Sequence, residues 1–198
     1  LMDSTTLMAI SPLDGRYQAS LAPFRRFFSE YGLIQYRVAV EIAWLKLLAQ
    51  EAKLPEIPPL SPAAIAHLDT ITNHFSENDA LRVKTIEATI NHDVKSVEYF
   101  VKERLAELPE LSKLTEFIHF GLTSEDVNNL AYALLFSTAK EEALLTTLNK
   151  LIAQLKTFAK QNASVAMLAR THGQSATPTT LGKELANVIA RLERQMAQ

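Results

Sequence analysis

Cysteine is absent from the 198-residue sequence, and glycine is scarce at five residues. The absence of cysteine excludes disulfides and thiolate metal sites, and it suits a reducing cytoplasm, where we expect the protein to work. Four of the eight prolines fall between residues 55 and 62. Since glycine is scarce and proline is concentrated there, the sequence predicts an all-α chain with one marked break.

The sequence also lacks a strong charge of either sign and a long apolar run. The net charge is −2 and the isoelectric point is about 6.2, so nothing favours binding to nucleic acid or to an anionic membrane. No window approaches the roughly 20 apolar residues of a membrane span, and the first residues do not resemble a signal peptide. No histidine pair has metal-ligand spacing, so we expect no metal site.

Apolar residues recur at helical spacing in the first half of the chain. The pattern predicts a helix over residues 29–52 and a second one that begins at the cap pair Ser61-Pro62 and runs to about residue 75. Residues 83–90, VKTIEATI, are rich in β-branched side chains and predict an interruption. A further helix is expected from residue 91, with Asn91 as its cap, until Pro109 closes it.

The second half of the chain predicts longer helices. A continuous helix is expected from Val127 to about Gln161, with a bundle seam formed by Leu144, Leu148, Leu151, Leu155 and Phe158. Another helix is expected to begin at Thr177-Pro178 and to run antiparallel to it. We therefore predict an N-terminal helical domain over residues 1–111, followed over 112–198 by the opening long helices of a central helical bundle.

Four polar clusters precede or connect these helices, and each has a plain structural interpretation beside a functional one. Thr123-Ser124-Glu125-Asp126 fits a capping box, or hydroxyls and free N–H groups that hold a carboxylate. Asn91-His92-Asp93 is either a solvated first helical turn or an imidazole at a helix N-terminus that binds phosphate or carboxylate. Arg16-Tyr17, after Asp14-Gly15, is a surface turn or an anion contact.

The fourth cluster, Arg170-Thr171-His172-Gly173-Gln174, is the least typical of a plain connection. Four of its five side chains can donate hydrogen bonds, and Gly173 permits an unusual backbone angle. An ordinary polar turn remains an alternative. Because two clusters lie at expected helix N-termini and this one lies just before another, their convergence would form a site for a ligand with several negative groups. His67, His74 and His119 lie within helical patterns and are assigned structural positions.

The four segments SPLDGRY, TINHDVKSVEYFVKE, EFIHFGLTSEDVNN and RTHGQSATPTTLGKELAN occur in this order. Together they resemble the adenylosuccinate lyase family of the fumarase/aspartase superfamily, and the resemblance covers nearly the whole chain. TSEDVNN and RTHGQSATP are similar to the first two signature regions of the superfamily. NHDVK and DGRY favour this family over the argininosuccinate lyase, fumarase and aspartase families.

The resemblance implies a non-hydrolytic β-elimination without a cofactor. Adenylosuccinate would give AMP and fumarate, and the succinyl carboxamide ribotide SAICAR would give AICAR and fumarate. By matching motif position, His172 would be the general acid that protonates the departing nitrogen. The matching substrate-binding residues would be Arg16, Tyr17, Asn91, His92, Asp93, Thr123, Ser124, Thr171 and Gln174. Of these, Thr123 and Ser124 would hold a substrate carboxylate, and His92 would lie near the phosphate.

The sequence departs from the family in one respect. A third signature region, similar to GSSAMPxKxNP and carrying the serine that acts as the base, does not occur in these 198 residues. The resemblance therefore implies an N-terminal fragment that is inactive alone, from a protein that forms a homotetramer with sites shared between subunits. Two alternatives remain: another lyase of the superfamily, such as argininosuccinate lyase, or a catalytically silent helical assembly module.

Overall fold

The computed structural model describes residues 7–51 and 54–198, and the chain divides into two compact units, residues 1–138 and 139–198. The expected domain boundary between residues 111 and 112 lies inside the first unit, and it stays a prediction. No helix in the described residues combines the length and the apolar character that a membrane crossing needs.

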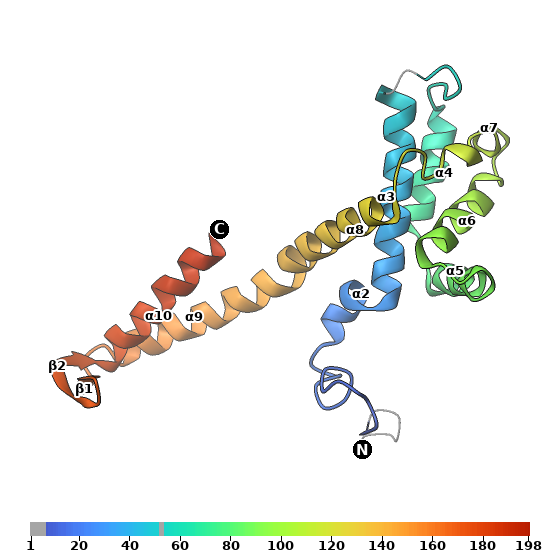
Figure 1. The fold of residues 1–198 in the computed structure, drawn as a ribbon. Helices are drawn as coiled ribbons and strands as arrows, with labels where there is room; N and C mark the ends of the chain where they lie inside the picture. Colours follow the sequence, from blue (N-terminus) through green and yellow to red (C-terminus); the bar gives the residue numbers. More distant parts are fainter. Residues whose placement is uncertain (1–6, 52–53) are drawn as a thin grey trace. The chain divides into compact units, whose positions relative to one another are not determined.

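The first unit is built from helices (Figure 1). In chain order they are η1 (Ala22–Phe24), α2 (Arg25–Phe28), α3 (Glu30–Glu51), α4 (Pro62–Asn73), α5 (Glu77–Ile90), α6 (Asp93–Leu105), α7 (Pro109–Ser112), η2 (Thr115–Phe117) and α8 (Ser124–Ala139). The expected cap pair is confirmed, because the Ser61 side chain accepts a hydrogen bond from the Ala64 N–H and Pro62 is the first residue of α4.

The expected interruption at residues 83–90 is wrong, since α5 runs unbroken through this segment. Ser76 and Asp79 form a reciprocal capping box that starts the helix, and Val83 is buried on its inner face. Thr85 uses its hydroxyl to donate to the carbonyl four residues back, Leu81 O, at 2.9 Å. Capping and burial therefore outweigh the weak helix preference of the β-branched side chains.

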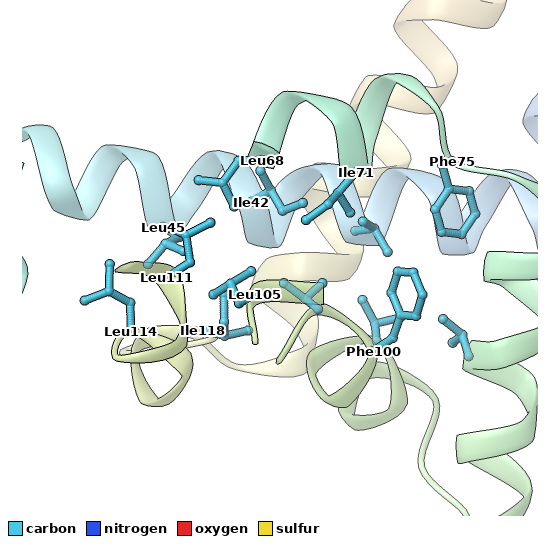
Figure 2. Close-up of a cluster of buried hydrophobic side chains, with 14 of the residues drawn as sticks. Ile42, Leu45, Leu68, Ile71, Phe75, Phe100, Leu105, Leu111, Leu114 and Ile118 are labelled. Carbon is cyan, nitrogen blue, oxygen red and sulfur yellow. The ribbon is translucent and has the colours of Figure 1, made fainter. Parts of the chain in front are cut away.

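The main core of the first unit lies between α3, α4 and α6 (Figure 2). Ile42 and Leu45 of α3 face Leu68 and Ile71 of α4 across it, and Phe100 of α6 closes it from the other side. These side chains are almost fully buried. A second apolar cluster forms on the other side of α3, so this helix packs against neighbours on two faces.

The second cluster joins α3 to the first turns of α6 and α8. Val40 of α3 packs with Val94 of α6 and with Val127 and Ala131 of α8. Val94 directly follows the Asn91-His92-Asp93 cluster, and Val127 directly follows Asp126. The apolar contacts therefore hold two of the four polar clusters against the same helix.

The second unit contains η3 (Lys140–Leu144, a π-helical turn), α9 (Leu145–Gln161), β1 (Ala166–Thr171), β2 (Gln174–Thr180) and α10 (Leu181–Met196). The expected helical run to Gln161 is confirmed, with the π-helical turn inside it. The expected helix start at Thr177-Pro178 is wrong. Both residues belong to β2, and α10 begins at Leu181 with Thr180 as its cap.

The polar connection between α9 and α10 is thus a β-hairpin, and its two strands form the single sheet of the described residues. β1 and β2 pair antiparallel, and β2 has one extra residue between the pairs Leu168–Pro178 and Arg170–Ser175. Proline lacks an N–H, and a two-stranded hairpin tolerates it because each strand has a free edge. The all-α class is confirmed for the chain as a whole.

Helices α9 and α10 pack through Ile152, Ala159 and Ile189. The expected seam along η3 and α9 is only partly buried within this chain, because Leu144, Leu151 and Phe158 stay about half exposed. The backbones approach closely at Gly182, where an added Cβ would lie 2.4 Å from Ala159 O. The Gly182 N–H also donates to Asn162 O at 3.0 Å, so this glycine fixes the base of the hairpin.

Replacing Gly182 by alanine should destabilise the second unit by about 1–3 kcal/mol, because the new methyl group meets backbone atoms that cannot move aside independently. The direction of this change distinguishes the site from an ordinary helical position, because Gly→Ala inside a helix usually stabilises the protein by roughly 0.5–1 kcal/mol. Hydrogen exchange of the α10 amides would measure the change. Val188→Ala, a truncation of a half-exposed side chain on the same helix, is the control. Increased protection of α10 in Gly182→Ala would contradict the prediction.

Candidate functional site

Arg16 and Tyr17 lie in a loop of successive turns. The Asp14 and Gly15 N–H groups both donate to Ser11 O at 3.1 Å, and the Tyr17 N–H donates to Pro12 O at 3.0 Å. The Arg16 guanidinium lies 5.8 Å from the centre of the Tyr17 ring, and both side chains are exposed. The loop therefore presents a cation and a phenol side by side to solvent.

The segment from Asn91 to Asp93 links α5 to α6 in a way that corrects the expected cap. Asn91 has a φ of 55° and closes α5 by donating its N–H to Glu87 O. His92 is the cap of α6, because its Nδ1 accepts a hydrogen bond of 3.1 Å from the Lys95 N–H. Asparagine tolerates the left-handed conformation that ends a helix, so it takes that position and leaves the cap to the histidine.

The cap also fixes the chemistry of the His92 ring. An Nδ1 that accepts a hydrogen bond carries no proton, so the neutral imidazole carries its proton on Nε2. The His92 side chain is 53% exposed. It can therefore cap the helix and still offer Nε2–H to a ligand at the N-terminus of α6.

Asp93 is committed to a protein partner. Its Oδ2 accepts a hydrogen bond of 2.7 Å from Nη2 of Arg37 on α3. Partial burial acts to raise the pKa of Asp93, but the hydrogen bond from the Val94 N–H and the Arg37 guanidinium outweigh it and lower the pKa. The carboxylate therefore stays charged and turned toward Arg37. Sequence reasoning missed this role of Arg37, because the residue lies within the apolar pattern of α3.

The Thr123–Asp126 cluster opens α8 with half of the expected capping box. Oδ2 of Asp126 accepts hydrogen bonds from the N–H of Thr123 at 2.7 Å and from its hydroxyl at 2.8 Å. These two bonds lower the pKa of Asp126. The other acid, Glu125, accepts a hydrogen bond of 3.0 Å from the Asn128 amide. Both acids therefore accept hydrogen bonds from donors near the start of α8.

The Ser124 side chain is therefore the readier donor of the pair. Among the described residues, no hydrogen bond to its hydroxyl is found, whereas the Thr123 hydroxyl donates to Asp126. An anionic group at this helix N-terminus could accept a hydrogen bond from Ser124 directly, whereas it would compete with Asp126 for the Thr123 hydroxyl. The two hydroxyls therefore differ, because the protein already engages that of Thr123.

The turn before α8 contains a contact that sequence reasoning also missed. His119 was expected inside a helical pattern, but it lies in a turn with a φ of 63°. Its Nδ1 is 2.6 Å from Oε1 of Glu41, which has no exposed surface. Burial raises the pKa of Glu41, while the hydrogen bond and charge of His119 act to lower it. Trp44 donates its indole N–H to Phe120 O at 2.8 Å, so α3 holds this turn at two points.

In the second unit, His172 and Gly173 form the two-residue turn of the hairpin. Their φ angles are 48° and 77°, and the flanking residues Thr171 and Gln174 pair with each other. A turn with two positive φ angles matches the right-handed twist of the strands it joins. The prediction that Gly173 adopts an unusual backbone angle is confirmed. All four side-chain positions are exposed, so the hairpin presents His172 at its tip.

The structure thus brings the site residues together in two sets. In the first unit, Asp93 and the segment around Thr123 are both attached to α3, and the Arg16-Tyr17 loop makes its hydrogen bonds within itself. In the second unit, Thr171, His172 and Gln174 share the tip of the hairpin. The described residues contain no group of three or more acidic, histidine or cysteine side chains close enough to hold a metal ion.

A family described as lyase matches residues 15–198, and the chain belongs to this family. Among curated proteins, it is similar over its full length to the adenylosuccinate lyases of Haemophilus influenzae (53% identity) and Escherichia coli K12 (52% identity). In both comparisons the chain covers 43% of the relative, so it spans less than half the length of these proteins.

Two solved structures share the fold at lower identity. The fumarate lyase from Mesorhizobium sp. BNC1 aligns with a TM-score of 0.64 at 20% identity, over 88% of this chain and 38% of that one. The 3-carboxy-cis,cis-muconate lactonizing enzyme from Pseudomonas putida aligns with a TM-score of 0.63 at 24% identity, over 88% of this chain and 37% of that one. At these identities the similarity establishes the fold and nothing more specific.

Proposed function

We propose that this chain is the N-terminal part of an adenylosuccinate lyase of purine biosynthesis. The enzyme would eliminate fumarate from adenylosuccinate to give AMP, and from SAICAR to give AICAR. The observation that carries the proposal is the 53% identity to an adenylosuccinate lyase over the full length of this chain. The exposed imidazole of His172 at the hairpin tip would supply the acid that the reaction needs.

The proposed chemistry assigns a role to each cluster. Removal of a proton next to a carboxylate builds negative charge, which Ser124 and Thr123 at the N-terminus of α8 would stabilise. The departing nitrogen needs a proton, which the imidazole of His172 would donate as general acid. Thr171 and Gln174 would orient substrate beside it.

The nucleotide would lie toward the other clusters. The Nε2–H of His92 and the N-terminus of α6 suit a phosphate group. Arg16 and Tyr17 would add a charged donor and a phenol from their loop. Asn91 and Asp93 would act chiefly by fixing this segment, since one closes α5 and the other pairs with Arg37.

The serine that would act as the base is not part of this 198-residue sequence, and the complete site would also need residues from other subunits. We propose a cytoplasmic homotetramer that needs no cofactor and whose sites are shared between subunits; the chain alone is expected to be inactive. Large apolar side chains that stay exposed on α8 and α9 support association: Leu130, Leu134, Phe136, Leu151 and Phe158. Monomeric proteins rarely leave so many large apolar side chains exposed to water, and such surfaces commonly mark interfaces.

The test is turnover by the full-length protein. We expect wild type to consume adenylosuccinate and to leave argininosuccinate unchanged. His172→Gln should lower kcat by about 10²–10⁴-fold, the usual contribution of general acid–base catalysis. His74→Gln, an exposed histidine at the end of α4, should retain the wild-type rate.

Two results would overturn the proposal. Preference for argininosuccinate would assign the chain to another lyase activity. A kcat for His172→Gln within tenfold of wild type, with the circular dichroism spectrum unchanged, would remove His172 as the acid.

A further inference from the structure

Arg37 of α3 is a buried cation with two directed contacts. It is 5% exposed. Its Nη2 donates to Oδ2 of Asp93 at 2.7 Å, and its Nε donates to Oδ1 of Asn128 at 2.9 Å. One contact reaches the first residue of α6 and the other reaches the first turns of α8. A single planar guanidinium therefore connects the two helix N-termini that carry the His92 and Thr123–Ser124 clusters.

The apolar surroundings show how closely these helices meet. Asp93 is followed by Val94, and Asn128 is preceded by Val127; both valines pack on Val40 of α3, three residues after Arg37. The hydrogen bonds and the apolar contacts thus form one junction of α3, α6 and α8. Apolar packing alone could close this junction, and it would avoid the cost of desolvating a charge.

What the guanidinium adds is direction. Its fork is planar and rigid, so the two bonds set both the position and the angle of the groups they hold. The same network also fixes the start of α8, because the Asn128 amide donates a hydrogen bond of 3.0 Å to Glu125. Glu125 directly follows Ser124. A lysine could reach Asp93 but has no second, fixed arm for Asn128.

We propose that Arg37 is a positioning residue that keeps the His92 cluster and the Thr123–Ser124 cluster in register, so that one substrate molecule can engage both. The proposal rests on the proposed function, in which the phosphate binds at the first cluster and a succinyl carboxylate at the second. Arg37 itself touches neither group. Its effect should therefore be large for a ligand that spans the clusters and small for a ligand that binds only one.

The experiment compares these ligands in the full-length protein. In Arg37→Met, kcat/KM for adenylosuccinate should fall on the order of 100-fold, because a displacement of about 1 Å can cost that much. The inhibition constants of AMP and of fumarate, each a part of the substrate, should change less than about threefold, since each part needs one cluster. The kcat/KM of Arg37→Lys for adenylosuccinate should lie between the values of wild type and Arg37→Met.

Two further variants keep the result interpretable. Asn128→Ala removes one arm of the junction and leaves Arg37 and Asp93 in place, so it should show the same split with a smaller loss even if Arg37→Met folds poorly. Arg82→Met is the matched control. Arg82 also donates a two-armed hydrogen bond, to Glu103, but at an exposed site, and surface pairs contribute little.

The outcomes separate the two proposals. Wild type that fails to turn over adenylosuccinate removes the proposed function and this inference with it. Active wild type, with AMP and fumarate binding lost in parallel with kcat/KM in the Arg37 and Asn128 variants, would show a general structural role and overturn the positioning role. A kcat/KM within threefold of wild type in folded Arg37→Met would overturn it as well.

Discussion

Replacing His119 by asparagine should lower the free energy of unfolding of the first unit by about 3 kcal/mol at pH 8, the cost of leaving a buried carboxylate without its hydrogen-bond partner. His119 is the hydrogen-bond partner of Glu41, whose side chain has no exposed surface. The other carboxylate oxygen of Glu41, Oε2, has no hydrogen-bond partner among the described residues. Asparagine suits the positive φ of this position, so the change isolates the lost imidazole from backbone strain.

The loss of stability caused by His119→Asn should grow as the pH rises. Burial raises the pKa of Glu41 above its unfolded value, so its contribution to stability is fully present below the unfolded pKa and is lost as the pH rises through the folded pKa. His119 acts to lower this pKa. Without His119 the folded pKa rises further, and more stability is lost between about pH 5 and pH 8.

Urea denaturation at pH 5 and pH 8, followed by tryptophan fluorescence, would measure this difference. Trp44 is the single tryptophan of the sequence, and it bonds to the same turn through Phe120 O. His74→Asn, at an exposed histidine, should stay within about 0.5 kcal/mol of wild type at both pH values. An equal deficit at pH 5 and pH 8 would refute the electrostatic explanation.

The residues that sequence reasoning missed share a physical cause. Arg37 and Glu41 are one turn apart on α3, and both are buried, although their types are usually exposed. Periodicity assigns a face of a helix but does not say which distant side chains meet it. The partners, Asp93 and His119, lie 56 and 78 residues away in the sequence. A charge within an apolar stripe was the available signal, and only the folded structure shows its partner.

The RTHGQ segment shows the opposite balance. Its polar character and Gly173 predicted a special backbone, and the positive φ angles of His172 and Gly173 confirm this. The hairpin around it was missed because its strands are largely exposed and show no alternation of apolar and polar residues. Proline at position 178 argued further for a helix start. Local chemistry was thus readable from the sequence, whereas strand pairing depends on contacts between segments.

Phe100→Ala should be the most destabilising core substitution, at about 3–5 kcal/mol. Phe100 is 2% exposed, and its ring meets Phe75 edge to face, with centroids 5.9 Å apart (Figure 2). Truncation removes the buried ring and its aromatic contact and leaves a cavity between α4 and α6. Tyr99→Ala, its neighbour on the exposed face of α6 at 42% exposure, should cost less than about 1 kcal/mol.

The same variant separates stability from positioning, because α6 carries His92 and Asp93 at its first turn while Phe100 lies two turns further on. Loss of Phe100 weakens the whole core but leaves the hydrogen bond between Arg37 and Asp93 in place. We therefore expect urea denaturation to show a lower midpoint for Phe100→Ala. In the full-length protein below its melting temperature, kcat/KM per folded molecule should change much less than in Arg37→Met. Equal kinetic losses in the two variants would mean that α6 is positioned by its core packing, and that the guanidinium junction adds nothing to it.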